Sequence, residues 1–214
     1  MPKRVNLQRW NRLCMALNIS PDRHEFTALV SAYSQPERHY HTLQHLDECL
    51  EKLDWAIAES RDLNSDCFNL IEVALWYHDA IYQPRAKNNE QKSAEWATRF
   101  LSESGLNPND VQLIQSLILA TEHRLTPVEM MHQLMVDIDL SILGAEVDRF
   151  QEYDRQIRQE YAWVPRSSYR EKRKEVLSFF LSKPRIYATD LFYRKFEKRA
   201  RKNLKRAIEN LNDD

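Results

Sequence analysis

The chain has 214 residues, of which 43% are hydrophobic and 29% charged, and its formal net charge is −1. This composition is ordinary for a soluble globular protein. No run of about 18 apolar residues occurs, which excludes a membrane-spanning helix. The chain contains only two glycines, Gly105 and Gly144. This disfavours an all-β fold, because tight hairpin turns use glycine heavily.

Helices are predicted almost throughout the chain, because hydrophobic residues recur at helical spacing and strand-like alternation is absent. Caps and breakers set the boundaries: Gly105 followed by Pro108 ends one helix, and Pro127 lies at the favoured first position of another. The expected fold class is therefore all-α. The predicted helices cover residues 5–17, 22–34, 42–61, 66–82 (capped by Asp66), 90–104, 107 or 109 to 122, a short one starting at 126–127, 135–144, 146–161, 167–182 and 188–211.

The three cysteines, Cys14, Cys49 and Cys67, are odd in number and show no Cys-x-x-Cys spacing. This pattern is typical of free thiols in a reducing compartment. The first 17 residues lack the unbroken apolar core of a secretory signal. We therefore expect a cytoplasmic protein.

The dipeptide His78-Asp79 is the most informative local feature, because it places an imidazole and a carboxylate inside an otherwise apolar helical run. His78 shares a helical face with Ile71 and Leu75, and Asp79 lies about 100° round the helix from it. A buried carboxylate is costly unless a cation or a set of hydrogen-bond donors compensates it. A metal ion beside this helix is one such compensator.

Two further polar residues have similar apolar surroundings. His45 lies next to Leu46 on the hydrophobic stripe of the helix 42–61, and Asp139 is flanked by Val136 and Leu140. Each residue taken alone is more often a hydrogen-bonded core group than a ligand. Together with His78-Asp79, however, they present nitrogen and oxygen ligands from separate helices, which suits a divalent transition metal such as Mn, Fe, Co, Ni or Zn.

A rival zinc cluster is formed in the sequence by His39, His41 and His45, because His41 and His45 share a helical face. It leaves Asp79 and Asp139 unexplained and therefore ranks lower. His41 can also form a hydrogen bond to a residue that binds the metal, or cap the start of its helix.

The order His45, His78-Asp79, Asp139 resembles the H…HD…D signature of the HD-domain metal-dependent phosphohydrolases. The local strings at 38–46, 76–82, 89–94, 120–123 and 137–144 are similar to those of a bacterial subgroup usually described as predicted HD-superfamily phosphohydrolases. The resemblance covers roughly residues 5–210. It implies one domain over 1–214, a compact HD-like helical bundle with its core at about 38–145 and C-terminal helices at about 146–211 packing on it.

The resemblance implies that His45, His78, Asp79 and Asp139 hold one divalent metal, with a second ion also allowed. Asp137 is the rival for the last ligand and is interpreted instead as an exposed or helix-capping acid. The implied reaction is hydrolysis of a phosphoester or phosphoanhydride of a small molecule, such as a nucleotide, by metal-activated water.

Within that reaction Asp79 would orient the water, and Glu90 and His123 are the candidates to protonate the leaving group. Each has a simpler interpretation, because Glu90 lies near a helix N-terminus and His123 near a helix C-terminus, where the helix dipole favours their charges. Cations for a substrate phosphate are expected first at Arg38, Lys92 and Arg124, and then at Lys87, Arg166 and Arg170, although most Lys and Arg are simply exposed.

Two other functions compete with the hydrolase. One is a non-catalytic HD module that binds a nucleotide or a protein partner. The other is a nucleic-acid binder, because residues 1–150 carry a net charge of −8 and residues 151–214 one of +7. A hydrophobic stripe from Phe192 to Leu204 favours ordinary packing of that basic segment. We therefore expect a small phosphorylated partner and neither nucleic acid nor membrane; a homo-oligomer is compatible with the sequence.

Overall fold

The computed structural model describes residues 3–59 and 63–213, and every regular element in this part of the chain is helical. The all-α prediction is confirmed. The elements are α1 (Leu7–Ala16), α2 (Arg23–Ala32), α3 (Leu43–Glu59), α4 (Ser65–Tyr77), α5 (Asn89–Glu103), α6 (Pro108–Ala120), α7 (Met130–Asp139), the 3₁₀ turn η1 (Leu140–Gly144), α8 (Val147–Glu160), α9 (Arg166–Ser182) and α10 (Asp190–Asp213).

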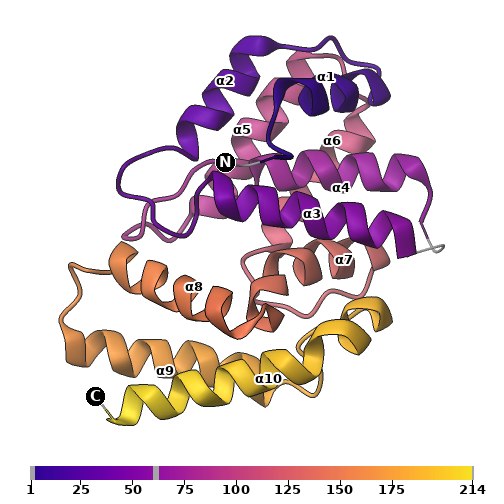
Figure 1. Ribbon diagram of the computed structural model, residues 1–214. Helices are drawn as coiled ribbons and strands as arrows, with labels where there is room; N and C mark the ends of the chain where they lie inside the picture. Colours follow the sequence, from indigo (N-terminus) through magenta and orange to yellow (C-terminus); the bar gives the residue numbers. More distant parts are fainter. Residues whose placement is uncertain (1–2, 60–62, 214) are drawn as a thin grey trace.

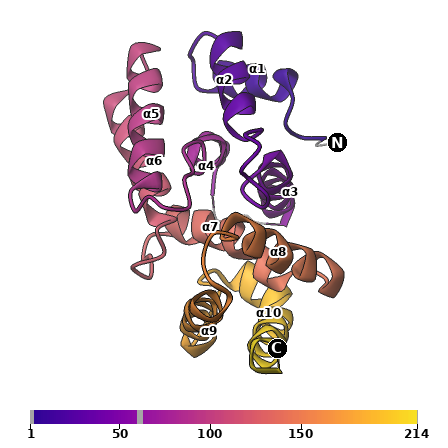
Figure 2. The ribbon, with the colours of Figure 1, turned by 90° about the vertical axis from the view of Figure 1, so that its left-hand side faces the viewer.

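The helices form an upper and a lower group, with α7 between them (Figure 1). In the upper group α4 is central and packs against α1, α3, α5 and α6. Figure 2 shows α8, α9 and α10 together below α7. In this lower group α10 packs against α9 and η1, and α8 also contacts η1. The two groups therefore meet along α7 and η1.

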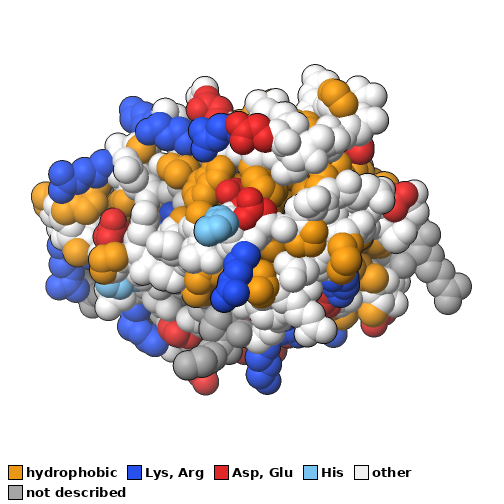
Figure 3. Space-filling view, turned by 90° about the horizontal axis from the view of Figure 1, so that it is seen from above, with side chains coloured by type: hydrophobic (Ala, Val, Ile, Leu, Met, Phe, Trp, Pro, Cys, Tyr) orange, Lys and Arg blue, Asp and Glu red, His pale blue; other side chains and the backbone are white. Residues whose placement is uncertain are grey.

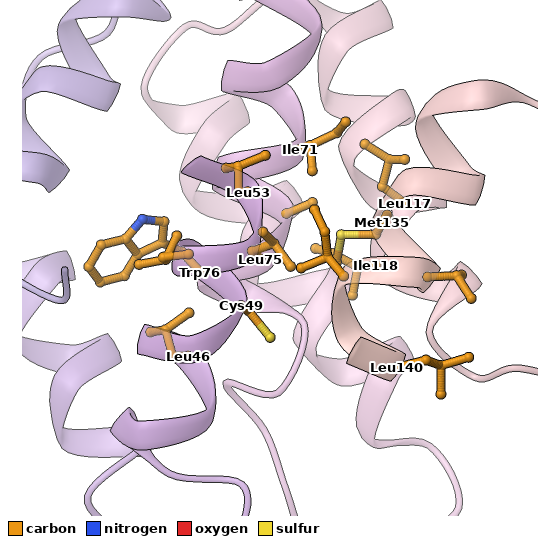
Figure 4. Close-up of a cluster of buried hydrophobic side chains, with 14 of the residues drawn as sticks. Leu46, Cys49, Leu53, Ile71, Leu75, Trp76, Leu117, Ile118, Met135 and Leu140 are labelled. Carbon is orange, nitrogen blue, oxygen red and sulfur yellow. The ribbon is translucent and has the colours of Figure 1, made fainter. Parts of the chain in front are cut away.

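Helix α4 is central because it is hydrophobic on nearly every side, as expected for a helix with few solvent-facing positions. Its Trp76 is fully buried and meets Trp10 of α1 edge-to-face, with ring centroids 5.5 Å apart. Burial of each large apolar side chain contributes roughly 1.5–3 kcal/mol. Side chains from α3, α4, α6, α7 and η1 share this core, among them Leu46, Cys49, Leu53, Ile71, Leu75, Leu117, Ile118, Met135 and Leu140 (Figure 4).

The boundaries of α4 differ from the prediction. Its N-cap is Asn64, whose side chain accepts a hydrogen bond from the Cys67 amide, whereas Asp66 lies in the first turn. The helix ends at Tyr77 with His78 as its C-cap, five residues before the predicted end at Tyr82. Tertiary contacts end it early, because the next amide, that of Asp79, donates to the hydroxyl of Tyr33. For α3, the predicted end near residue 61 lies outside the described residues.

The short helix predicted at residues 126–127 is wrong. Residues 126–128 are not helical, and α7 begins at Met130. The side chain of Gln133 donates to the carbonyls of Pro127 and Val128, so these carbonyls are bound by a side chain instead of by a helical ladder. Pro127 therefore lies in the loop that leads into α7, and its favoured position at a helix start is not used.

The lower group is attached where α7 ends. At Gly144 a Cβ atom would lie 2.7 Å from Cβ of Phe196, so only glycine lets α10 approach this closely. Asn203 of α10 donates to the carbonyls of Leu143 and Ala145, at 2.9 Å each. These contacts hold α10 beside η1 and so fix the end of α7, which carries Asp139.

None of the described helices combines the length and the hydrophobicity that crossing a membrane requires. The face at the α1–α2 end mixes basic, acidic and hydrophobic side chains, without a broad area of one charge (Figure 3).

Candidate metal centre and adjoining cleft

Four predicted ligands converge from three helices. His45 lies in α3, His78 and Asp79 follow the end of α4, and Asp139 is the last residue of α7. The Nε2 atoms of His45 and His78 are 3.1 Å apart. The Asp79 carboxylate lies 3.3 Å from Nε2 of His45 and 3.1 Å from that of His78. The Asp139 carboxylate lies 3.3 and 3.7 Å from the same two atoms.

These separations fit ligands that share one ion. Nitrogen and oxygen atoms bound at about 2.0–2.2 Å to one transition metal lie roughly 2.8–3.6 Å apart for angles of roughly 90–110° at the ion. The separations among the two imidazoles and Asp79 lie inside that range, and the longest, from His78 to Asp139, lies just outside it. The set therefore fits a single divalent metal with small side-chain adjustments.

The histidine rings are held in orientations that suit ligands. Nδ1 of His78 lies 2.7 Å from the carbonyl oxygen of Leu75, which can only accept, so Nδ1 carries the proton and donates it. Nε2 then faces the centre, and its lone pair becomes available to a metal when Nε2 loses its proton. Metal-binding histidines commonly have their other nitrogen fixed in this way. Both rings are almost completely buried, with His45 and His78 exposed by 2% and 1%.

The electrostatics of the centre favour positive charge. Burial lowers the pKa of His78, but the negative charge of Asp79 and the hydrogen bonds to both carboxylates outweigh it, so the pKa lies well above its usual value. Burial raises the pKa of Asp139, but hydrogen bonds from His123, His45 and His78 hold it well below the ordinary range. A centre that attracts protons this strongly offers the same stabilisation to a metal cation.

Cys49 is a neighbour that the sequence analysis treated only as a free thiol. It is buried one turn after His45, and its Sγ lies 3.7 Å from both ring nitrogens of that histidine. Ligand atoms of His45, Cys49, His78 and Asp139 all lie within 4.8 Å of one another, and this group could hold a metal ion. The i, i+4 spacing of His45 and Cys49 was the available signal.

His123 joins the centre through Asp139. Its Nε2 lies 2.9 Å from Oδ2 of Asp139, the oxygen that does not face His45 and His78. Helix α6 ends at Ala120, and His123 lies beyond it with a left-handed backbone (φ 56°), which costs a non-glycine residue about 1 kcal/mol. Its position therefore serves the contact to Asp139 and not a helix dipole. Its Nδ1 is buried and finds no hydrogen-bond partner within residues 3–59 and 63–213.

A cleft of about 710 Å³ adjoins the centre. Predicted residues Glu90, His123 and Arg124 line it, as do the basic residues Lys87, Lys172 and Arg173. Burial raises the pKa of Glu90, and the negative charge of Asp79 raises it further, which indicates that Glu90 is near the centre. Arg124 is exposed and forms an ion pair with Glu122.

Two residues expected at a substrate phosphate lie elsewhere. Lys92 is exposed on α5 and is absent from the wall of the cleft. Arg38 is buried and donates to the carbonyls of His41, Asp79 and Ala80. Its guanidinium is thus largely occupied by backbone groups, and it binds the turn that carries Asp79, whose carboxylate faces His45 and His78. Arg38 therefore holds the backbone at Asp79 and Ala80 in place and does not face the cleft.

Asp137 faces away from the centre. It is completely buried, so the expectation of an exposed acid is wrong, and the amides it binds precede α10, so it supports the start of that helix without capping it. Its oxygens accept hydrogen bonds from the amides of Ala188 and Thr189 and from the Thr189 hydroxyl, just before α10 begins. Of the two acids of α7, the structure brings Asp139 and not Asp137 to the histidines.

The histidine-only cluster does not form. His39 is exposed, and the ring of His41 is bound through Nδ1 to Glu160 of α8 at 2.7 Å. Glu160 was missed by the sequence analysis. No local pattern could have indicated it, because its partners at 39–41 and Tyr82 lie 78 to 121 positions away in the chain.

Comparisons with protein-family models, with curated proteins and with solved structures find no match to this chain. The functional assignment therefore depends on the geometry of the centre and on the motifs in the sequence.

Proposed function

We propose that this protein is a metal-dependent phosphohydrolase of the HD type that acts on a small phosphorylated molecule. The observation that carries the proposal is the convergence of His45, His78, Asp79 and Asp139 in a buried centre with ligand separations suited to one ion. The resemblance of the sequence motifs supports the same reaction class. Groups whose pKa is strongly shifted by burial and a specific charged partner, beside a cleft, are candidates for a functional site.

A divalent metal held by these residues supplies water activated near neutral pH and polarises a phosphoryl oxygen. Asp79 is suited to orient the attacking water, because its carboxylate accepts hydrogen bonds and lies at the border of the centre, with 14% of its side chain exposed. Asp139 divides its two oxygens between the pair His45 and His78 and the ring of His123. It thus couples the centre to a residue that lines the cleft.

The cleft supplies groups for the phosphate and the leaving group. Lys87, Arg124, Lys172 and Arg173 contribute positive charge to its wall. Three of them already face acids, since Arg124 pairs with Glu122, Lys172 with Glu175 and Arg173 with Asp154. Glu90, whose pKa is raised by burial, retains a proton more readily than an ordinary carboxyl group and can donate it to a leaving oxygen.

The proposal is tested by elemental analysis of the purified full chain and of His78→Ala and Asp139→Ala, after incubation with Mn²⁺, Co²⁺, Ni²⁺ or Zn²⁺. We expect near-stoichiometric metal in the parent and its loss in both variants. The matched control is His132→Ala, because His132 is a partly buried histidine that bonds to Ser116 and lies outside the centre.

The metal-loaded protein is then tested on a panel of phosphomonoesters, phosphodiesters and nucleotides. Hydrolysis that disappears in His78→Ala and persists in His132→Ala supports the hydrolase. Metal bound without turnover of any substrate class would favour a non-catalytic HD module. A parent protein that binds no metal would overturn the proposal.

A further inference from the structure

The cleft beside the metal centre has a second histidine in its wall. His41 lies in the loop before α3, and it lines the cleft together with His123 and Glu90. One turn further along the chain is His45, whose Nε2 faces the centre. The ring of His41 is directed differently, and a buried carboxylate determines that direction.

That carboxylate belongs to Glu160, whose side chain is completely buried. One oxygen accepts the backbone amides of His39, Tyr40 and His41 at 2.8–3.0 Å. The other accepts the Tyr82 hydroxyl at 3.0 Å and lies 2.7 Å from Nδ1 of His41. Successive amides around one oxygen form an anion-binding nest. Burial raises the pKa of Glu160, but the hydrogen bond and charge of His41 and the backbone amides of His41 and His39 outweigh it and hold the pKa at about 2, so the group is ionised and can only accept.

His41 is therefore fixed in one orientation. Nδ1 donates to Glu160, and the ring stacks on Tyr82 with centroids 3.9 Å apart and an interplanar angle of 23°. Among the residues that the structure describes, no hydrogen-bond partner is found for Nε2, and the side chain is 19% exposed. The other histidines at the centre differ, because Nε2 of His45 and His78 face each other and Nε2 of His123 faces Asp139.

The interactions of Glu160 do not require a histidine at position 41. Three backbone amides and the Tyr82 hydroxyl already satisfy its two oxygens, and another planar side chain could stack on Tyr82. What a histidine adds is a second nitrogen on the far side of the ring. Since His41 lines the cleft, that nitrogen is available to a bound molecule.

We propose that His41 contacts the phosphoryl group of the substrate through Nε2, and that Glu160 is the positioning residue that holds it there. This inference rests on the proposed phosphohydrolase function and adds a substrate-binding residue to it. With an anion on either side, both ring nitrogens can donate, and such charge-assisted hydrogen bonds are about twice as strong as neutral ones.

The test compares His41→Asn with His39→Asn. In His41→Asn the side-chain amide can replace Nδ1 as the donor to Glu160, but it has no group at the position of Nε2. His39 is exposed on the same loop and does not line the cleft, so it is the matched control. For the full chain loaded with Mn²⁺, we would measure metal content, the thermal midpoint, binding of inorganic phosphate by calorimetry, and hydrolysis of p-nitrophenyl phosphate.

We expect His41→Asn to keep its metal and its thermal midpoint, and to lose about tenfold to a hundredfold in phosphate affinity, as for a hydrogen bond between charged groups. His39→Asn should stay within about twofold of the parent, by the usual smallness of surface effects. For Glu160→Gln, we expect the same loss of phosphate affinity with metal retained, which separates positioning from ligation.

Unchanged phosphate affinity in a metal-loaded His41→Asn would overturn the assignment of His41 while the metal centre remains. Absence of phosphate binding by the metal-loaded parent would also overturn the role of His41 and leave the metal centre in place. A parent without metal would overturn both this inference and the function on which it rests.

Discussion

Two pairs of inward-facing carboxylates, Asp79 with Asp139 and Asp137 with Glu160, have their negative charge compensated in different ways. In the centre, Asp79 and Asp139 face imidazoles, and no backbone amide donates to either side chain among the described contacts. At the joints between the upper and lower helices, Asp137 and Glu160 receive backbone amides and hydroxyl or imidazole donors from distant segments. Burial of an acid is therefore not by itself a sign of a metal site.

The two pairs of acids differ in whether a metal ion can take the place of the proton that their hydrogen-bond donors supply. Amides that bind Asp137 or Glu160 are fixed parts of the fold, so these acids anchor α10 and α8. Imidazoles that face Asp139 can exchange a proton for a metal ion without any change of fold. The comparison predicts that variants of Asp79 and Asp139 alter metal binding, and that variants of Asp137 and Glu160 alter stability while metal binding is kept.

The largest contrast is expected between two acids of the same helix. Asp139→Asn should weaken metal binding about a hundredfold or more, because even groups that only support ligands typically contribute ten- to a hundredfold. Asp137→Asn should leave metal affinity within about threefold of the parent value. Competition with a fluorescent chelator measures both. Equal losses in the two variants would show that α7 acts only as a scaffold.

Glu160→Gln should destabilise the protein by about 3 kcal/mol at pH 7. Its pKa is lowered from 4.5 to about 2 in the folded state, so its ionised form contributes stability above pH 4.5. That contribution is lost as the pH falls toward 2 and should be about half as large near pH 3. Urea unfolding of the parent and the variant at both pH values measures it. A difference that does not shrink in acid would contradict this origin.

Metal should stabilise the parent by about 2.7 kcal/mol when present at a hundredfold excess over Kd. For a chain of this size, this corresponds to a rise of roughly 5–10 °C in the thermal midpoint. His45→Ala should show no rise, whereas Glu160→Gln should show the full rise from a lower starting point. A rise in His45→Ala would place the bound metal elsewhere.

The smallest effect is expected at Asp137. Burial raises its pKa from 3.8 to about 6, so its ionised form costs stability at neutral pH, and that cost declines as the pH falls from 6 toward 3.8. Relative to Asp137→Asn, the parent should gain about 1 kcal/mol between pH 7 and pH 5. This sign is opposite to that of Glu160. Urea unfolding of the parent, Asp137→Asn and Glu160→Gln at several pH values measures both effects. If the stability difference between parent and variant changes in the same direction with pH for both residues, the contrast between these two acids is wrong.

Much of the site was predictable because its signals are local. His78 and Asp79 stand out within an apolar run, and His45 and Asp139 have apolar neighbours of their own, so each was recognisable without knowledge of the fold. The helical class followed from the spacing of hydrophobic residues and the near absence of glycine. These features depend on residues within a few positions of one another.

Other assignments depended on contacts between distant segments. Arg38 reads as a free cation, yet it binds the carbonyl of Asp79, 41 positions away. No local pattern marks Glu160, yet its carboxylate binds the amide of His41 from 119 positions away. The loop at 126–128 follows from side-chain contacts that override a helix-start signal.

The sequence by itself determined that the chain is helical and which four residues are suited to a metal, because hydrophobic periodicity and a costly buried carboxylate are properties of short segments. Only the tertiary structure decided that Asp137 binds the segment before α10, and that His41 and not Arg38 lines the cleft. The physical reason is that a buried polar group is defined by its hydrogen-bond partner, and the partner is chosen by the packing of helices far apart in the chain.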